Sequence, residues 1–84
     1  MTPLELADAC EKATGSSNKL DVLIEVALFK PAGRWRSVRA NSAGTKVIYT
    51  DTRGRDWTYW AGDYTMSAER RSAAAAALRA WGKM

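Results

Sequence analysis

Three short segments rich in tryptophan, valine, isoleucine, tyrosine and threonine follow one another in the middle of the chain and constrain its fold most. They span residues 35–40, 46–51 and 56–61, and the runs 41–44 (Asn-Ser-Ala-Gly) and 52–55 (Thr-Arg-Gly-Arg) between them have the composition of hairpin turns. Strands joined by such short turns pair as antiparallel neighbours. The sequence therefore predicts a three-stranded antiparallel meander.

Side chains alternate between the two faces of such a sheet. In the third segment, Trp57, Tyr59 and Ala61 are predicted to share one face, and Thr58 and Trp60 the other. Neither face of the first segment is purely apolar. Its two alternating sets are Arg36, Val38 and Ala40 on one face and Trp35, Ser37 and Arg39 on the other.

A helix is predicted at the start of the chain. Thr2 is suited to cap it, Pro3 to occupy its first position, and Glu5 to complete a capping box. Gly15 is expected to supply the stop. The predicted buried stripe, in which Cys10 behaves as a small apolar residue, consists of Leu6, Ala9, Cys10 and Ala13.

Residues 18–29 are predicted to form a second helix, although their β-branched residues also suit a strand. The serines and Asn18 before this segment offer N-caps, and Asp21 and Glu25 are four residues apart, as on one face of a helix. These features favour the helix. The run 30–33 (Lys-Pro-Ala-Gly) is expected to end it.

The last predicted helix begins after Ser67, its expected N-cap, and contains an alanine-rich run over residues 72–78. Gly82 is the expected C-cap. This helix has a narrow apolar stripe, whose alanines would allow close approach to a sheet. The stripe consists of Ala74, Ala77, Leu78 and Trp81. The whole chain is thus predicted to be one small α+β domain, residues 1–84, in the order α-α-β-β-β-α, with helices against one or both faces of the meander.

Catalytic chemistry is poorly represented in this sequence. The chain has one cysteine and no histidine, which excludes an internal disulfide, a zinc site of the Cys/His type, and any Ser-His or Cys-His pair. The run Ser42–Lys46 lacks the first glycine and the Gly-Lys-Ser/Thr order of a phosphate loop. Asp51 and Asp56 flank one turn, where turn hydrogen bonding is the expected role. We therefore expect a non-enzyme without cofactor or metal.

Charge and hydropathy limit the setting and the partners. No long apolar run is present, so no membrane span is expected, and the lack of a disulfide or signal peptide predicts a cytoplasmic protein. Residues 1–29 contain five acids and two lysines, a net charge of −3, whereas residues 30–84 contain eleven bases and four acids, a net charge of +7. A basic block of this kind suits nucleic acid, an anionic protein face, or the acidic part of a second copy.

The candidate binding residues are arginines interleaved with tryptophans on the predicted meander, a pattern that suits stacking combined with contacts to anions. The alternative is that the tryptophans pack under a helix and the arginines only keep the surface soluble. Two further arginines begin the last helix, where they either pair with Asp63 or Glu69 or meet an anionic partner. The predicted partner-binding set is Arg34, Trp35, Arg36, Arg39, Arg53, Arg55, Trp57, Trp60, Arg70 and Arg71.

Residues 15–24 (Gly-Ser-Ser-Asn-Lys-Leu-Asp-Val-Leu-Ile) follow a short predicted helix, and residues 63–68 are Asp-Tyr-Thr-Met-Ser-Ala. Both stretches resemble segments of a known group of small phage and prophage proteins, the phage ABA-sandwich family. The first is similar to the family's Gly-Pro-Ser-Arg-Glu-Leu-Asp opening, with Ser16 in place of proline and Lys19 in place of the acid, and the second to its Tyr-Thr-x-Ser segment. The resemblance implies a phage origin and a sheet between helical layers, and it brings no activity or site residues.

A phage origin implies a range of functions in the host bacterial cytosol. The first expectation is a non-enzymatic inhibitor of a host defence complex, an anti-CRISPR or similar anti-defence protein that acts by binding and steric occlusion. The alternatives are a small basic nucleic-acid-binding or regulatory protein and a structural or assembly accessory of the phage. A steep loss of affinity with salt would distinguish nucleic-acid binding.

Overall fold

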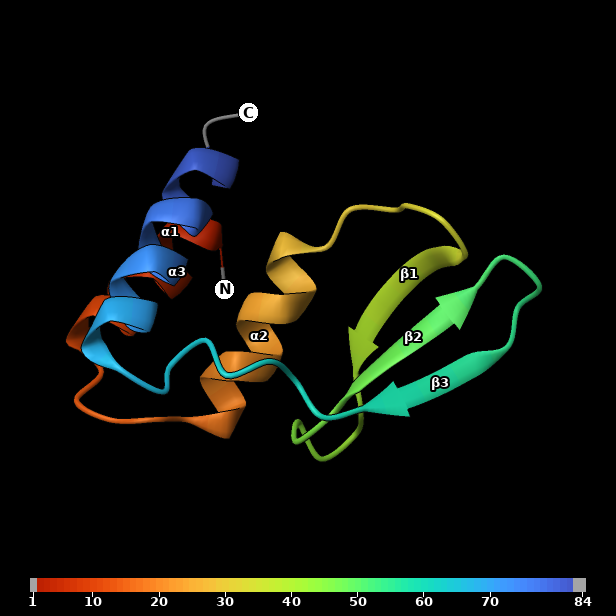
Figure 1. The fold of residues 1–84 in the computed structure, drawn as a ribbon, viewed down its shortest axis with the longest axis horizontal. Helices are drawn as coiled ribbons and strands as arrows, with labels where there is room; N and C mark the ends of the chain where they lie inside the picture. Colours follow the sequence, from red (N-terminus) through yellow and green to blue (C-terminus); the bar gives the residue numbers. More distant parts are fainter. Residues whose placement is uncertain (1, 83–84) are drawn as a thin grey trace.

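The computed structural model describes residues 2–82 and has the predicted α+β fold, in the order α-α-β-β-β-α (Figure 1). The three strands form one antiparallel sheet in the order β1-β2-β3. Residues 18–28 form a helix, which confirms the predicted helix over the alternative strand. The elements are α1 (Pro3–Lys12), α2 (Asn18–Leu28), β1 (Trp35–Ala40), β2 (Val47–Asp51), β3 (Asp56–Tyr59) and α3 (Ala68–Gly82).

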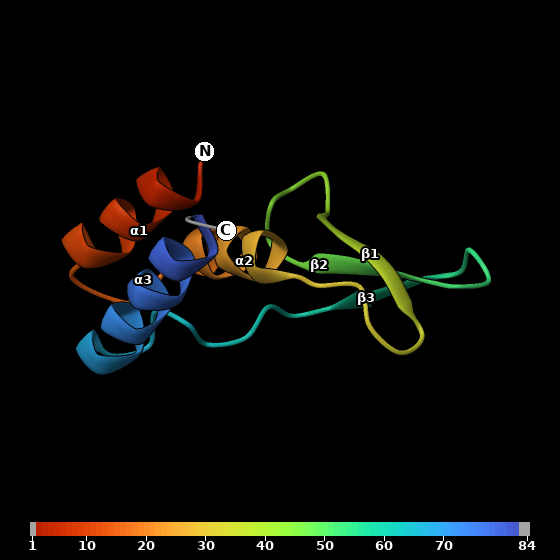
Figure 2. The same cartoon turned by 90° about the horizontal axis from the view of Figure 1, so that it is seen from above.

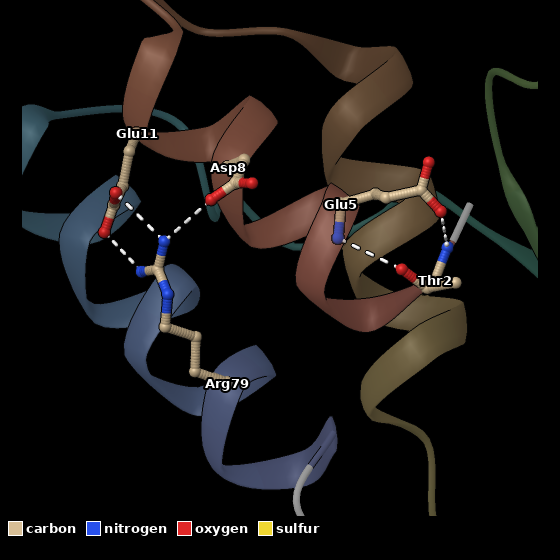
Figure 3. Close-up of polar contacts among 5 residues, drawn as sticks. All are labelled: Thr2, Glu5, Asp8, Glu11 and Arg79. Carbon is tan, nitrogen blue, oxygen red and sulfur yellow. Dashed lines mark hydrogen bonds and ion pairs between the residues drawn. The ribbon is translucent and has the colours of Figure 1, made fainter.

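The helix N-termini are capped largely as predicted. The Glu5 backbone N–H donates to Thr2 Oγ1 at 3.2 Å, and the Thr2 N–H donates to Glu5 Oε1 at 3.1 Å, which completes the capping box (Figure 3). Ser17 caps α2, and Ser67 Oγ accepts from the third residue of α3. The stop of α1 differs from the prediction: Ala13 leaves the helix in extended conformation, and Gly15 lies beyond it without a left-handed φ.

The apolar core lies among the helices. α1 and α3 pack side by side, with α2 between them and the sheet, as both views show (Figures 1 and 2). The alanine-rich face of α3 therefore packs on α1, so the prediction that these alanines approach the sheet is wrong. Cys10 is buried, as predicted. The buried core residues are Leu6, Ala7, Cys10, Ile24, Ala74, Ala75 and Leu78.

An arginine clamp joins α1 to α3 at the surface of this helical half, by which we mean the three helices together. Both terminal nitrogens of Arg79 reach the Glu11 carboxylate, and Nη2 also donates to Asp8 Oδ1 at 3.0 Å (Figure 3). These pairs are exposed, so solvent screens them and each adds little to stability. The clamp fixes the relative position of two helices from opposite ends of the chain.

Both hairpin turns form where they were predicted. Gly44 and Gly54 have positive φ values of 70° and 82°, a conformation that glycine adopts without a steric penalty. A bulge between Trp35 and Ser37 interrupts the pairing of β1 with β2. Trp35 consequently joins the face that carries Tyr49, and the centroids of the two rings are 5.1 Å apart. The predicted grouping of Trp35 with Ser37 and Arg39 is therefore wrong.

The register and the bulge give the sheet two unlike faces. The aromatic face carries Trp35, Tyr49, Trp57 and Tyr59. The polar face carries Arg39, Thr50, Asp56 and Thr58. The aromatic face meets α2 at Tyr49.

α2 joins the sheet to the rest of the molecule. Tyr49 donates its hydroxyl to Glu25 Oε2 at 2.6 Å, and the Phe29 ring meets the Tyr49 ring edge-on with 5.9 Å between centroids. The segment after β3 is held by Asp21, which accepts from the backbone N–H and the hydroxyl of Thr65 at 2.9 Å each. All helices thus lie on one side of the sheet (Figure 2), whereas the phage resemblance implies helical layers on both sides.

Candidate functional site

Five of the predicted binding residues meet at the end of the sheet that lies away from the helices (Figures 1 and 2). We call them, together with the carboxylate of Asp51 that organises them, the arginine–tryptophan cluster. Its members come from the segment before β1, the start of β1, the end of β2, the β2–β3 turn and the start of β3. They are Arg34, Trp35, Asp51, Arg53, Arg55 and Trp57.

The guanidinium of Arg34 lies between two indole rings. Its Cζ atom is 4.3 Å from the Trp35 centroid and 4.7 Å from the Trp57 centroid, both within cation–π range. A tight turn places it there, because Gly33 has a φ of 58° and the Trp35 N–H donates to the Ala32 carbonyl at 3.1 Å. The Arg34 carbonyl in turn accepts from the Thr52 N–H at 2.9 Å. The charge of Arg34 is therefore held in a fixed position.

Asp51 is the buried anchor of the cluster. Its Oδ1 accepts the backbone N–H groups of Arg53 and Arg55 at 2.9 Å each, and its Oδ2 accepts Trp57 Nε1 at 3.1 Å. The predicted role of Asp51 in turn hydrogen bonding is thus confirmed. Its hydrogen bond from the Trp57 indole, which orients that ring, is a further contact. The backbone hydrogen bond from Arg55, followed by that from the Trp57 indole, lowers the pKa of Asp51 from 3.8 to about 2. Asp51 is therefore ionised throughout the physiological range.

The cluster has an excess of positive charge. Arg34, Arg53 and Arg55 line a shallow hollow of about 320 Å³ together with Asp51 and Thr52. The one carboxylate forms an ion pair with Arg55, at 3.4 Å from Nε. Three guanidinium groups around one carboxylate leave a net charge of +2, and guanidinium groups bind carboxylates and phosphates well because of their fork of N–H donors. The hollow can therefore hold an anionic group of a partner.

Five of the predicted residues lie outside the cluster, and three of them are on the meander or directly after it. Arg39 is on the polar face, where it donates to Asp56 Oδ2 at 2.8 Å and to Thr50 Oγ1 at 3.0 Å. The hydrogen bond with Asp56 raises the pKa of Arg39, so this charge is already partnered. Arg36 is exposed at the bulge. Trp60 follows β3 and is 68% exposed, with Lys46 Nζ at 4.5 Å from its ring centroid.

Arg70 and Arg71 hold the chain that enters α3. Arg71 Nη1 donates to the Thr65 carbonyl at 3.0 Å, and Arg70 Nη1 donates to the Asp63 carbonyl at 3.4 Å. Their partners are backbone carbonyls and not the carboxylates that the sequence suggested. Both arginines belong to the helical half, so the structure does not bring them to the cluster.

Another hollow lies between α3, the end of α2 and the segment 62–64. It measures about 450 Å³, and its lining is Leu28, Gly62, Asp63, Tyr64, Arg70, Ala73, Ala74 and Ala77. It has size but few polar groups that converge on a ligand. We therefore place the candidate site at the arginine–tryptophan cluster, where charge and geometry converge.

Residues 2–82 give little support for metal binding, a membrane span or a reactive thiol. They contain no group of three or more cysteine or acidic side chains placed to hold a metal ion, and no helix long and apolar enough to cross a membrane. Burial raises the pKa of the Cys10 thiol, which keeps it protonated and unreactive. Comparison of the chain with protein-family models, curated proteins and solved structures found no match.

Proposed function

We propose that this chain is a non-enzymatic phage protein that binds an anionic surface of a host defence complex and blocks it by occlusion. The arginine–tryptophan cluster is the observation that carries the binding part of this proposal, because it is a preorganised cationic surface at the end of the molecule most distant from its core. The phage setting rests on the resemblance of residues 15–24 and 63–68 to the phage ABA-sandwich family. A CRISPR–Cas effector is one such complex.

The acidic residues of the chain support occlusion rather than mimicry of nucleic acid. A mimic needs carboxylates that face outward without partners, and all five acids of residues 1–29 have partners within the chain. Glu5 caps α1, Asp8 and Glu11 bind Arg79, Asp21 binds Thr65, and Glu25 binds Tyr49. The charge that remains available for a partner is therefore positive.

The arrangement of Trp57 supports a protein partner over single-stranded nucleic acid at the cluster. Arg34 lies 4.7 Å and Arg55 5.9 Å from its ring centroid, so its ring already has cationic neighbours where a base would stack. The edges of the guanidinium groups bind carboxylates and phosphates alike in bidentate fashion, so the choice of partner rests on the occupied ring of Trp57. An acidic protein surface therefore matches the cluster best.

Nucleic-acid binding is the second candidate, and Trp60 is the observation that favours it. Its ring is 68% exposed and lies beside Lys46, a combination that allows a base to stack while the ammonium meets a phosphate. In this case Trp60→Ala, and not a change in the cluster, would remove most of the affinity. The two candidates thus use different residues.

The test is capture of host proteins on the tagged chain, with and without nuclease, combined with plating of phage on a host that carries the defence system. We expect the wild-type protein to retain an identified defence subunit after nuclease treatment and to restore plating. Arg53→Glu should lose both, because it reverses an exposed charge of the hollow while its backbone N–H still binds Asp51.

The matched control is Lys19→Glu, the same reversal at an exposed position of α2 in the helical half. It should behave as wild type. Equal loss in both variants would show that only net charge matters and would contradict a defined site. Captured material that disappears with nuclease, with a steep salt dependence, would replace the first candidate with the second.

A further inference from the structure

β3 is an exposed edge strand with few of the features that normally protect such an edge. All four of its residues are exposed, and it pairs only with β2. Natural edges are commonly protected by short length, charged side chains, proline or a bulge, and β3 has only its short length and Asp56. This edge has instead Trp57 and Tyr59, exposed at 38% and 42%, followed directly by Trp60. An edge of this kind is suited to pairing with another strand.

The hydrogen-bonding pattern shows which backbone groups are available there. The Asp51 N–H donates to the Arg55 carbonyl at 2.9 Å and closes the hairpin as a hydrogen-bonded pair. Hydrogen-bonded and non-hydrogen-bonded pairs alternate along an antiparallel ladder. With the observed register, Trp57 and Tyr59 bond to β2, whereas Asp56 and Thr58 direct their N–H and carbonyl groups away from it.

We propose that two copies of the chain pair through β3, antiparallel and centred on Thr58, to form one six-stranded sheet. In this register Thr58 faces Thr58 of the second copy, and their outward N–H and carbonyl groups bond to each other. Trp57 then faces Tyr59 of the second copy as a non-hydrogen-bonded pair, the kind in which side chains are closest. Asp56 faces Trp60 of the second copy.

The side chains on both faces fit this register. On the aromatic face, the row Val38, Tyr49 and Trp57 of one copy continues into Tyr59 and Val47 of the other, and aromatic cross-strand pairs of this kind stabilise sheets. On the polar face, the acidic Asp56 meets a tryptophan that lies beside Lys46.

Local charge does not oppose the pairing. Arg39 is paired with Asp56 and Arg55 with Asp51, so the two arginines nearest the edge are already compensated. The net charge of +4 on each copy adds a weak long-range repulsion that salt screens. Salt should therefore strengthen the dimer, whereas it should weaken the binding of an anionic partner. The inference does not rest on the proposed function: Trp57 takes part in both, but the pairing is carried by the outward backbone groups of Asp56 and Thr58, which the cluster does not use.

Sedimentation over a wide range of protein concentration tests the proposal. We expect a reversible shift from the 9.2 kDa chain to twice that mass. Thr58→Pro should weaken dimerisation by about tenfold or more, because it removes the outward N–H at the two-fold axis and leaves the bonds to β2 intact. Thr58→Ala, which keeps the N–H, should change the dissociation constant by about threefold at most.

A second variant and a second measurement guard against misfolding of the proline variant. T58K places two like charges opposite each other at the axis and should also give a monomer with an unchanged circular dichroism spectrum. Hydrogen exchange should show the Asp56 and Thr58 amides protected in the wild-type dimer and unprotected in T58K. A wild-type chain that stays monomeric at millimolar concentration, or a dimer that T58K leaves intact, would overturn the proposal.

Discussion

In the helical half, apolar side chains from three helices meet in one core, whereas the sheet has Val47 as the single buried apolar residue of its described strands. The sheet is held instead by aromatic rings around Tyr49, by the hydrogen bonds of its ladder, and by carboxylates such as Asp51 and Asp56. All four residues of its third strand are exposed. The two regions therefore differ in the kind of interaction that stabilises them.

This difference separates stability from binding. A chain of 84 residues has little apolar surface to bury, and here the fully buried apolar side chains other than Val47 belong to the helices. The sheet can therefore expose charged and aromatic side chains without loss of the core. The proposed functions and the proposed dimer all use the sheet, and the three predictions below test how far the two regions are independent.

The largest effect is expected in the helical core. Leu78→Ala should lower the free energy of unfolding by about 2–5 kcal/mol, because Leu78 is fully buried and its removal leaves a cavity. Leu4→Ala is the matched control, since Leu4 is 50% exposed on α1, and it should cost less than about 0.5 kcal/mol. Denaturant unfolding followed by circular dichroism measures both. Similar losses in the two variants would contradict the position of the core.

An intermediate effect is expected at the junction between the regions. Tyr49→Phe removes the hydroxyl that donates to Glu25 and should cost about 1–2 kcal/mol, because a partly buried carboxylate loses a donor. Tyr59→Phe is the control, since the Tyr59 hydroxyl forms no hydrogen bond among residues 2–82, and it should change stability by less than about 0.5 kcal/mol. If tryptophan fluorescence and circular dichroism then show separate transitions in Tyr49→Phe, the two regions are joined mainly by this bond.

The smallest effect is expected at the far end of the sheet and depends on pH. The pKa of Asp51 is lowered on folding from 3.8 to about 2, so its charge stabilises the fold above about pH 4 and this contribution is lost as the pH falls toward 2. Asp51→Asn cannot ionise and should show a shallower loss of stability over that range. Unfolding curves at a series of pH values measure the difference. Parallel pH dependence in both proteins would show that Asp51 does not contribute.

Much of the fold was predictable because its local signals are strong. The capping box at Thr2 and Glu5 and the glycines at positions 44 and 54 each specify one backbone conformation, so the order of elements and the bounds of β1 follow from the sequence. The arginine–tryptophan cluster was partly predictable, since its members lie on the predicted meander and the segment before it. The capping box and the bonds of Asp51 to the turn join residues close along the chain, whereas Arg34 meets Trp57 only because the meander brings them together.

The remaining features depend on contacts that local patterns do not encode. The alanine-rich face of α3 suits a sheet and a helix equally, and only the whole fold places α1 against it. The bulge beside Arg36 moves Trp35 to the other face, and a period-two alternation does not reveal a bulge. Arg39 was grouped with Arg34 and Arg55 because all three fall on the predicted meander and its turns, yet it lies on the polar face of the sheet, away from the cluster.

The arginine clamp between α1 and α3 has a consequence for the order of folding. Arg79 and Asp8 are 71 residues apart along the chain, whereas each hairpin closes over a few residues. Because short loops close at lower entropic cost than long ones, we expect the hairpins to form early and the pairing of α1 with α3 to come last. The interactions that form after the transition state mainly set the rate of unfolding. The residues that contribute most to the stability of this molecule would thus act chiefly by making its unfolding slow.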